Sequence, residues 1–258
     1  MRRSRWIFGV ILLALEAALL PGICAEPDAK EPAPLSLEQV VRSLDARSRA
    51  RAQALRQFDG IRTYRVQYHG FPSGHAEMVV AVHYRAPATK DFRIVSQSGS
   101  KLIIDHVFKP LLESEHQGAA DPARVEVTSR NYEFALTGFE PGPEGGLYVL
   151  TAKPRFADRF LFRGRVWVDA RDFAVVRIEG QPAESLSFWI RRTEIHHTYR
   201  KVESFWLPAE DLSTTYLRLG GHADLSIQYD RYDIRQADPV PSTDVEAGVS
   251  PLAITTVN

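Results

Sequence analysis

The sequence predicts a mainly β fold, in which about ten strands and two or three helices build one curved antiparallel sheet. The clearest observation is the stretch from Arg159 to Tyr232, where apolar and polar residues alternate in several strand-length runs that carry three of the four tryptophans. Two other segments space their apolar residues as amphipathic helices do, and Gly- and Pro-rich turns separate the runs. This pattern predicts a sheet wrapped around an apolar interior.

Charge and cysteine content exclude several kinds of partner and site. The chain has 32 basic and 32 acidic residues, so it lacks the net positive charge typical of a nucleic-acid binder, and no nucleic-acid partner is expected. Its one cysteine is Cys24, which leaves the rest of the chain without a thiol for disulfides, metal binding or redox chemistry. We expect a monomer that needs no cofactor.

Residues 1–25 have the organisation of a cleaved signal peptide. Three arginines precede the apolar run from Trp6 to Leu20, and Ala25 ends a plausible cleavage site. The predicted location is therefore the periplasm. A lipid anchor on Cys24 is the alternative, although Ile23 stands where a bacterial lipobox prefers a small residue. An uncleaved anchor is disfavoured, because the run has about 15 residues and a spanning helix needs roughly 20.

The remaining chain divides into three predicted parts. Residues 26–35 are predicted to be a flexible linker, residues 36–235 a single domain, and residues 236–258 a disordered tail. The domain is predicted to open with an amphipathic helix over residues 37–57, because Ser36 and Gln39 have the spacing of a capping box. Asp59-Gly60 is expected to end this helix.

Strands are predicted wherever apolar residues alternate between turn signals. A hairpin is expected from Tyr64 to Tyr84 around Pro72-Ser73-Gly74, followed by a third strand near Phe92. The later strands are predicted at residues 131–139, 147–152, 160–169, 173–179, 187–199, 205–219 and 222–234.

A second helix is predicted over residues 101–116, with a polar loop at 117–129. Its apolar positions are Leu102, Ile103, Val107 and Leu111. Pro110 lies inside the pattern and is expected to kink or divide the helix, because proline lacks a backbone donor and clashes with the preceding turn. We interpret this helix as a movable lid.

No catalytic or metal-binding constellation is predicted. The histidines with the best placement for such a role are His69, His75, His83, His196 and His197. They show no metal-ligand spacing, and His196 and His197 point to opposite faces of one predicted strand. The chain has no Gly-x-Ser-x-Gly elbow, and Asp169 to Asp172 fits a tight turn better than a pair of glycosidase carboxylates.

The apolar strand faces are therefore the functional candidates, with an ordinary filled core as the alternative interpretation. The predicted ligand-binding residues are Tyr64, Val66, Tyr68, Met78, Val80, Val82, Phe92, Ile94, Phe134, Leu136, Phe160, Phe162, Phe188 and Ile190. So many apolar faces predict a curved sheet too wide to be filled by its own side chains, which leaves a ligand cavity.

Several motifs in residues 36–234 resemble those of a known family. They are the early helix and first hairpin, Gly164-Arg165-Val166-Trp167-Val168-Asp169, Phe188-Trp189-Ile190, Trp206-Leu207-Pro208 and Ile227-Gln228-Tyr229. In these the chain is similar to the periplasmic carriers that sort outer-membrane lipoproteins, the LolA-like and LolB-like superfamily. The resemblance implies an unclosed, strongly curved antiparallel sheet covered by helices, and binding of lipid or lipoprotein acyl chains without catalysis.

Three functions remain open on this basis. The first is an exported carrier of lipid or lipoprotein acyl chains with an inner- or outer-membrane sorting partner. The second is an envelope sensor or protein-interaction module of the same fold, and the third, least favoured, is an exported hydrolase.

Overall fold

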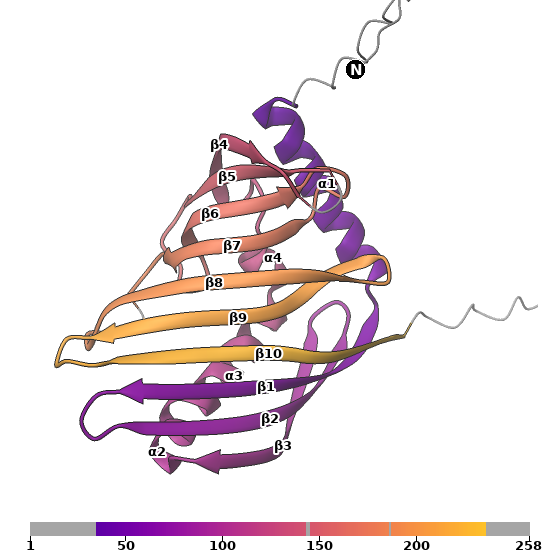
Figure 1. The fold of residues 1–258 in the computed structure, drawn as a ribbon. Coiled ribbons are helices and arrows are strands. Elements are labelled where there is room, and N and C mark those ends of the chain that lie inside the picture. Colours follow the sequence, from indigo (N-terminus) through magenta and orange to yellow (C-terminus); the bar gives the residue numbers. More distant parts are fainter. Residues whose placement is uncertain (1–34, 143–144, 186, 236–258) are drawn as a thin grey trace, which may run out of the picture. The chain divides into compact units, whose positions relative to one another are not determined.

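The computed structural model describes residues 35–142, 145–185 and 187–235, so the predicted signal peptide, nearly all of the predicted linker and the predicted tail lie outside the described residues. The described residues form one ten-stranded antiparallel sheet in the order β3-β2-β1-β10-β9-β8-β7-β6-β5-β4 (Figure 1). The strands are β1 (Gln57–His69), β2 (Gly74–Arg85), β3 (Thr89–Gly99), β4 (Tyr132–Glu140), β5 (Leu147–Pro154), β6 (Phe162–Asp169), β7 (Val175–Pro182), β8 (Ile190–Val202), β9 (Phe205–Leu217) and β10 (His222–Arg235). The edge strands β3 and β4 do not pair with each other, which confirms the predicted unclosed sheet.

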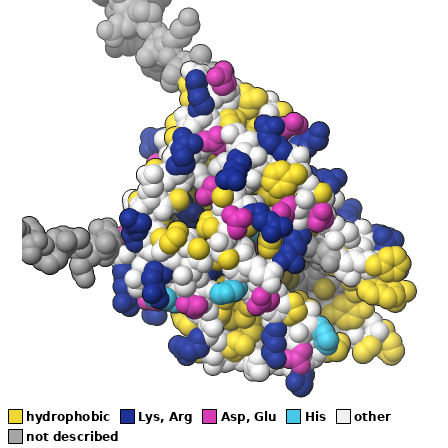
Figure 2. Space-filling model, turned by 180° about the vertical axis from the view of Figure 1, so that it is seen from behind, with side chains coloured by type: hydrophobic (Ala, Val, Ile, Leu, Met, Phe, Trp, Pro, Cys, Tyr) yellow, Lys and Arg dark blue, Asp and Glu magenta, His cyan; other side chains and the backbone are white. Residues whose placement is uncertain are grey.

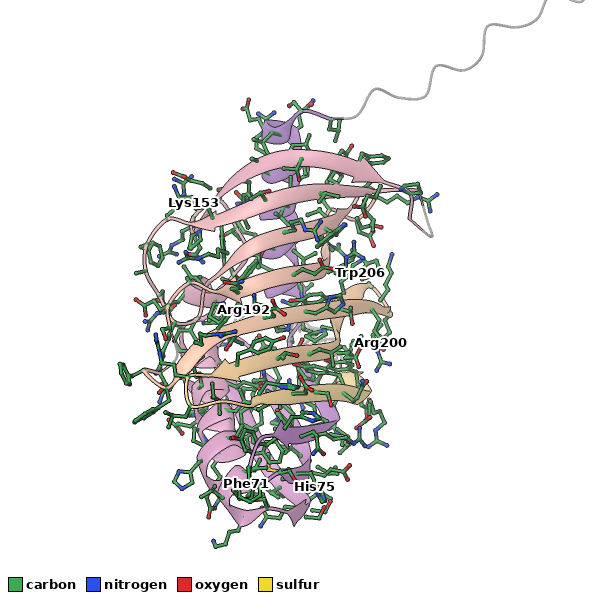
Figure 3. All side chains as sticks on the ribbon, turned by 60° about the vertical axis from the view of Figure 1, so that its left-hand side comes forward. Phe71, His75, Lys153, Arg192, Arg200 and Trp206 are labelled. Carbon is green, nitrogen blue, oxygen red and sulfur yellow. The ribbon has the colours of Figure 1, made fainter. Side chains whose placement is uncertain are left out.

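Helices cover one face of this sheet. They are α1 (Leu37–Ala54), α2 (Lys101–Ile103), a π-helical turn η1 (Ile104–Phe108), α3 (Lys109–Ala120) and α4 (Pro122–Val125). Figure 1 shows α1 and α3 on the same side of the sheet, behind the strands in that view. The opposite face is polar, and Figure 3 shows Lys153, Arg192 and Arg200 on it. In the described part of the chain, no helix is both long and apolar enough to cross a membrane.

The first helix begins as the sequence predicts. Ser36 Oγ accepts a hydrogen bond from the Gln39 backbone N–H, and Gln39 Oε1 accepts one from the Ser36 N–H at 2.9 Å, which completes the capping box. The predicted end was wrong, because α1 stops at Ala54. Gly60 lies inside β1, where it pairs with Val82 on one side and Tyr232 on the other. Ladder pairing on both sides therefore outweighs the local turn tendency of Asp59-Gly60.

The second helix also differs from its prediction in detail. A π turn at Ile104–Phe108 divides it, and the Lys109 N–H bonds back to the Ile104 carbonyl. Pro110 follows immediately in the first turn of α3, next to the π turn. The predicted loop at 117–129 was wrong, since α3 continues to Ala120 and α4 follows.

The covered face carries two hydrophobic clusters, one beneath each long helical cover. The first lies between the α2–η1–α3 segment and strands β1, β2, β9 and β10. The second lies between α1 and strands β4 to β7, with Val40 and Leu44 as the buried residues of the helix. The interior is thus two cores along one sheet.

Strands β6 and β7 approach each other closely at two facing glycines. Gly164 pairs with Gly180, and a Cβ atom on Gly164 would lie 2.0 Å from the Glu179 carbonyl oxygen. Only glycine fits such an approach. The adjacent Trp167 is buried, and its indole N–H donates to Glu140 Oε2 at 2.9 Å. This tryptophan is a scaffold residue.

Candidate functional site

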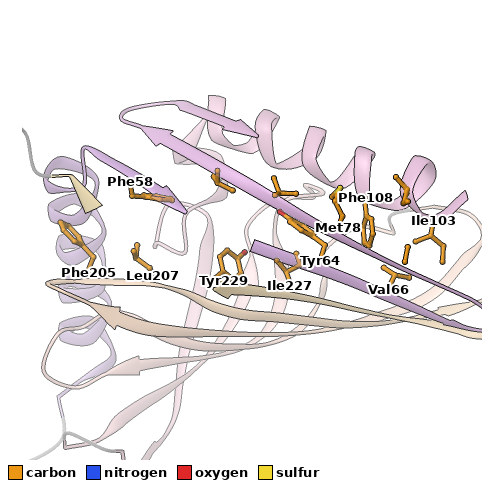
Figure 4. Close-up of a cluster of buried hydrophobic side chains, with 14 of the residues drawn as sticks. Phe58, Tyr64, Val66, Met78, Ile103, Phe108, Phe205, Leu207, Ile227 and Tyr229 are labelled. Carbon is orange, nitrogen blue, oxygen red and sulfur yellow. The ribbon is translucent and has the colours of Figure 1, made fainter. Parts of the chain in front are cut away.

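The α2–η1–α3 segment, which we call the lid, packs its apolar side directly onto the sheet (Figure 4). Ile103, Ile104 and Phe108 are buried, and the Phe108 ring meets that of Tyr64 edge-on with 6.1 Å between centroids. Met78 is fully buried in the same cluster. The lid therefore fills the surface that the sequence analysis predicts to bind a ligand.

The predicted ligand-binding residues fall into three groups. Those in the cluster under the lid are Tyr64, Val66, Met78, Val80 and Val82, with Phe92 partly buried against them. Those in the cluster under α1 are Phe162, with Phe134 and Leu136 partly buried against it. Those outside both clusters are Tyr68, Phe160 and Ile190, which are half-buried, and Ile94 and Phe188, which are exposed. The structure does not bring the whole set onto one surface.

The predicted lid residues divide in the same way. Ile103 is buried and Leu111 is partly buried in the cluster, whereas Leu102 and Val107 face solvent. Sequence reasoning missed Ile104 and Phe108, because it placed the apolar side on Leu102, Ile103, Val107 and Leu111 and expected an irregularity only at Pro110. The π turn widens one helical turn and shifts the apolar side of the lid by one residue. Pro110 was the one signal in the sequence for such an irregularity.

A buried charge cluster joins the lid to the sheet. Glu115 Oε2 on α3 accepts hydrogen bonds from Arg62 of β1 at 2.7 Å and from Lys90 of β3 at 2.8 Å. Its other oxygen accepts the Tyr64 hydroxyl at 3.0 Å. Arg62 is only 3% exposed. One carboxylate of the lid is therefore held by three strand side chains.

Lys90 and Arg62 stabilise the ionised form of Glu115. Burial alone would raise the pKa of the Glu115 carboxyl, but Lys90 and Arg62 outweigh it and lower that pKa to about 2. Burial is also the main cause that lowers the pKa of Lys90, an effect that Arg62 adds to and Glu115 opposes. Glu115 is thus ionised at neutral pH, and its removal would leave Arg62 as a buried charge without its carboxylate.

The polar contacts continue from Arg62 across the sheet. Its guanidinium lies over the Tyr229 ring, 4.5 Å from the centroid. The Tyr229 hydroxyl donates to Asp211 Oδ2 at 2.5 Å, and Asp211 Oδ1 pairs with His197 Nδ1 at 2.6 Å. A row of polar side chains therefore runs from the lid through β1, β10 and β9 to β8. Sequence reasoning weighed His197 but did not predict this row, since its members are scattered along the chain.

The second notable feature is a set of exposed apolar residues, which we call the apolar rim, at one end of the sheet. They are Phe71 at 100% exposure, Leu219 at 84%, Phe188 at 75% and Trp189 at 56%. Phe71 lies in the β1–β2 turn, Leu219 in the β9–β10 turn, and the other two just before β8, so antiparallel pairing brings them to the same end. Phe71 is labelled in Figure 3, and Figure 2 shows apolar side chains projecting from this side of the molecule.

Arg218 holds two residues of the rim in place, and its backbone N–H donates to the Trp189 carbonyl oxygen at 2.9 Å. The rings of Phe188 and Trp189 meet edge-on at 5.4 Å. Arg218 donates from Nε to the Phe188 carbonyl oxygen at 2.7 Å and lies over the Phe188 ring. The rim therefore presents ordered aromatic groups next to positive charge. Exposed apolar groups gathered in this way are typical of a binding surface.

Comparison with known proteins relates the chain to solved structures only. No family model and no curated protein matches it. A domain assigned to outer membrane lipoprotein sorting from Vibrio parahaemolyticus is 10% identical, with 79% of this chain and 95% of that chain covered and a TM-score of 0.39. A LolA superfamily protein from Nitrosomonas europaea is 10% identical, with 80% and 96% covered and a TM-score of 0.34.

A third structure, the MucA/MucB complex of Pseudomonas aeruginosa, is 11% identical, with 72% of this chain and 93% of that chain covered and a TM-score of 0.23. The likeness to these three structures is one of fold alone, at 10–11% identity.

Proposed function

We propose that this protein is an exported carrier that binds a lipid or lipoprotein acyl chain between the lid and the sheet. The observation that carries the proposal is a single helical cover over a cluster of buried apolar strand side chains, fastened near its end by Glu115. In this proposal the ligand takes the place of Ile103, Ile104 and Phe108 against the sheet. The proposed contact surface consists of Tyr64, Val66, Met78, Val80 and Val82.

The burial energy of the three lid side chains and that of an acyl chain are of comparable size. Burial of each large side chain of the lid stabilises the closed form by about 1.5–3 kcal/mol, so the three together contribute roughly 5–9 kcal/mol. An acyl chain of about 16 carbons gains on the order of 12 kcal/mol when it leaves water. Burial of an acyl chain therefore offsets the burial energy lost when the three lid side chains leave the sheet. The lid can thus cover the apolar strand surface when no ligand is bound and still give way to a ligand.

The lid has features that suit movement. The π turn at Ile104–Phe108 is a short irregular segment of the kind often found at functional sites. Lys90 and Glu115 are each about one-fifth exposed, so water reaches the charge cluster once the lid lifts. Hydration then replaces the ion pairs that opening breaks. The same residues fasten the lid when the site is empty.

The apolar rim is the proposed contact with a sorting partner in the inner or outer membrane. The periplasm is the proposed compartment, on the strength of the signal-like residues 1–25. Figure 1 places the start of α2 at the same end of the sheet as the β1–β2 and β9–β10 turns. A partner bound at the rim would therefore lie next to the lid and its ligand.

The experiment compares two neighbouring valines on opposite faces of β2. Val80 is fully buried under the lid, whereas Val79 lies on the other face. Binding of a fluorescent fatty acid should fall at least tenfold in Val80→Asp and stay unchanged in Val79→Asp. Far-UV circular dichroism verifies that each variant is folded. Equal binding by both folded variants would contradict the proposed site.

Should Val80→Asp fail to fold, a milder change tests the same surface. Val82→Thr keeps the shape of the side chain and adds one hydroxyl to the apolar surface under the lid. It should weaken fatty-acid binding measurably while the matched variant Val79→Thr does not. No difference between this pair would reject acyl-chain binding at this face.

A second candidate function, a protein-interaction module, is favoured by the exposure of Phe71, Phe188, Trp189 and Leu219. Native mass spectrometry of the protein purified from its own envelope separates the two. Acyl lipid bound to the isolated chain supports the carrier. A lipid-free chain that retains a protein partner supports the interaction module, and turnover of an ester panel would support the least favoured hydrolase.

A further inference from the structure

The strand ends at the apolar rim bring together two histidines and an aspartate. His69 ends β1 and His222 begins β10, and the two residues are direct partners across these strands. Asp224 lies two residues farther along β10, on the same face as His222. The face is the outer one, because His69 is three residues from the buried Val66.

The side-chain atoms of this trio converge. Asp224 Oδ2 lies 3.1 Å from His69 Nε2 and 3.7 Å from His222 Nε2. One ligand atom from each of the three residues lies within 4.8 Å of the others. The imidazole rings stack with 4.5 Å between centroids and 16° between planes. Two imidazole nitrogens thus lie near one carboxylate oxygen, and one of the stacked rings has to rotate before both nitrogens direct their lone pairs at the same ion.

These spacings match those of a divalent metal site. With metal–ligand bonds of roughly 2.0–2.1 Å, two ligands of a tetrahedral zinc ion are about 3.3 Å apart. The two measured nitrogen–oxygen distances, 3.1 and 3.7 Å, lie on either side of that value. Two imidazoles and one carboxylate suit Zn²⁺ and its first-row neighbours, whereas Mg²⁺ and Ca²⁺ prefer oxygen ligands alone.

Surrounding residues hold the trio in place. Thr214 on β9 donates its hydroxyl to Asp224 Oδ1 at 2.7 Å, which leaves Oδ2 directed at the histidines. Gly221, with a φ of +79°, sets the turn before His222. A Cβ atom there would lie 2.8 Å from the His69 carbonyl oxygen, so glycine is required. The Tyr216 ring lies 5.8 Å from that of His222.

We infer that His69, His222 and Asp224 form a binding site for one Zn²⁺-type divalent ion. Each of the three side chains is between a third and a half exposed, so an ion reaches them from solvent. The three leave a fourth position open to water or another ligand. A hollow of about 460 Å³ adjoins the site, with Asp224, Thr214 and His75 in its wall. The inference does not depend on the proposed carrier function, since the site lies on the other face of the sheet.

Zinc titration of the protein carrying no affinity tag, after treatment with a chelator, tests this inference by isothermal calorimetry. The expected result is binding of one Zn²⁺ per chain and no heat with Mg²⁺. His69→Ala and Asp224→Asn should each weaken zinc binding at least tenfold. Thr214→Val should weaken it about tenfold, the usual effect of losing a group that orients a ligand.

The matched controls are His106→Ala and His196→Ala, because these histidines are at least partly exposed and lie outside the trio. Both should bind zinc as the unchanged protein does. Replacement of zinc by Co²⁺ gives a second measurement, in which a strong visible absorption band reports tetrahedral coordination and disappears in His222→Ala. Absence of zinc binding, or equal binding by the trio variants and the controls, would overturn the inference.

Discussion

Arg62 of β1 and Glu115 of α3 are separated by 53 positions in the chain and meet at 2.7 Å between Nη1 and Oε2 in the interior. Arg62 is almost fully buried, and Lys90 binds the same oxygen of Glu115. The pair therefore joins the lid to two strands of the sheet. This arrangement makes the lid sensitive to the charge of a single side chain.

Glu115→Gln should destabilise the protein by about 3–5 kcal/mol, because it removes the negative partner of a buried charge and keeps the side-chain shape. Urea denaturation measures the loss. The rate of amide hydrogen exchange should increase most in residues 101–120. Glu113→Gln is the control, since Glu113 is exposed on the same helix and its replacement should change stability by less than about 0.5 kcal/mol. Equal losses in both variants would contradict the role of the charge cluster.

Stability should depend on pH through the same carboxylate. Lys90 and Arg62 outweigh burial and lower the pKa of Glu115 from its ordinary value of 4.5 to about 2. A depressed pKa in the folded state adds stability above pH 4.5, which is lost as pH falls through 2. The loss amounts to about 3 kcal/mol. Urea titrations at pH 7, 5 and 3 should show a fall in the free energy of unfolding that is smaller in Glu115→Gln, because only the contributions of other carboxyls such as Asp172 remain there. Parallel curves for the two proteins would disprove the linkage.

Phe108→Ala should lower the free energy of unfolding by about 3–5 kcal/mol, because Phe108 of the lid is fully buried against Tyr64. If the protein is a carrier, the Phe108→Ala substitution also leaves space for a ligand under the lid, so the affinity for a fatty acid should rise. Val107→Ala is the control, since Val107 is the neighbouring residue of the π turn and faces solvent. A loss of stability without any gain in fatty-acid affinity would favour a permanently filled core.

The apolar rim should contact a partner in the envelope. A photo-crosslinking amino acid in place of Trp189 should give adducts in intact cells, whereas the same group in place of Phe139 should not. Phe139 is a suitable control because it is also an exposed aromatic residue, and it lies at the opposite end of the sheet. The identity of the adduct, lipid or protein, also separates the two candidate functions. Absence of a crosslinked adduct at position 189 would contradict the proposal that the apolar rim contacts a partner.

Local patterns predicted the elements well where neighbouring residues control them. The alternation of apolar residues located all ten strands of the described chain, because each strand exposes one face and buries the other. The predicted start of β1 was wrong, since this strand begins at Gln57 and not near Tyr64. Ser36 and Gln39 located the start of α1, because both capping bonds are made within four residues. Asp169 likewise makes its predicted turn, since Oδ1 accepts the N–H groups of Arg171 and Asp172.

Longer-range packing decided the features on which function depends. Gly60 became part of a strand because two ladders pair with it, against its local turn tendency. The π turn changed which lid residues face the sheet, so Phe108 replaced Val107 in the core. Phe188 was predicted to face the interior with Ile190, but it lies before β8 begins and is exposed.

The amino-acid pattern alone therefore established a mainly β sheet with helical covers and an apolar inner face, because burial gives neighbouring residues a period of two in strands and of about 3.6 in helices. That the sheet is unclosed was implied by the family resemblance and not by this pattern. The pairing of Arg62 with Glu115, and of His69 with His222 and Asp224, depends instead on strand register and on where the lid docks. Such contacts join positions far apart in the chain. The periodicity of apolar residues does not reveal which distant residue a charged side chain or a histidine will contact. Only the tertiary structure could bring them together.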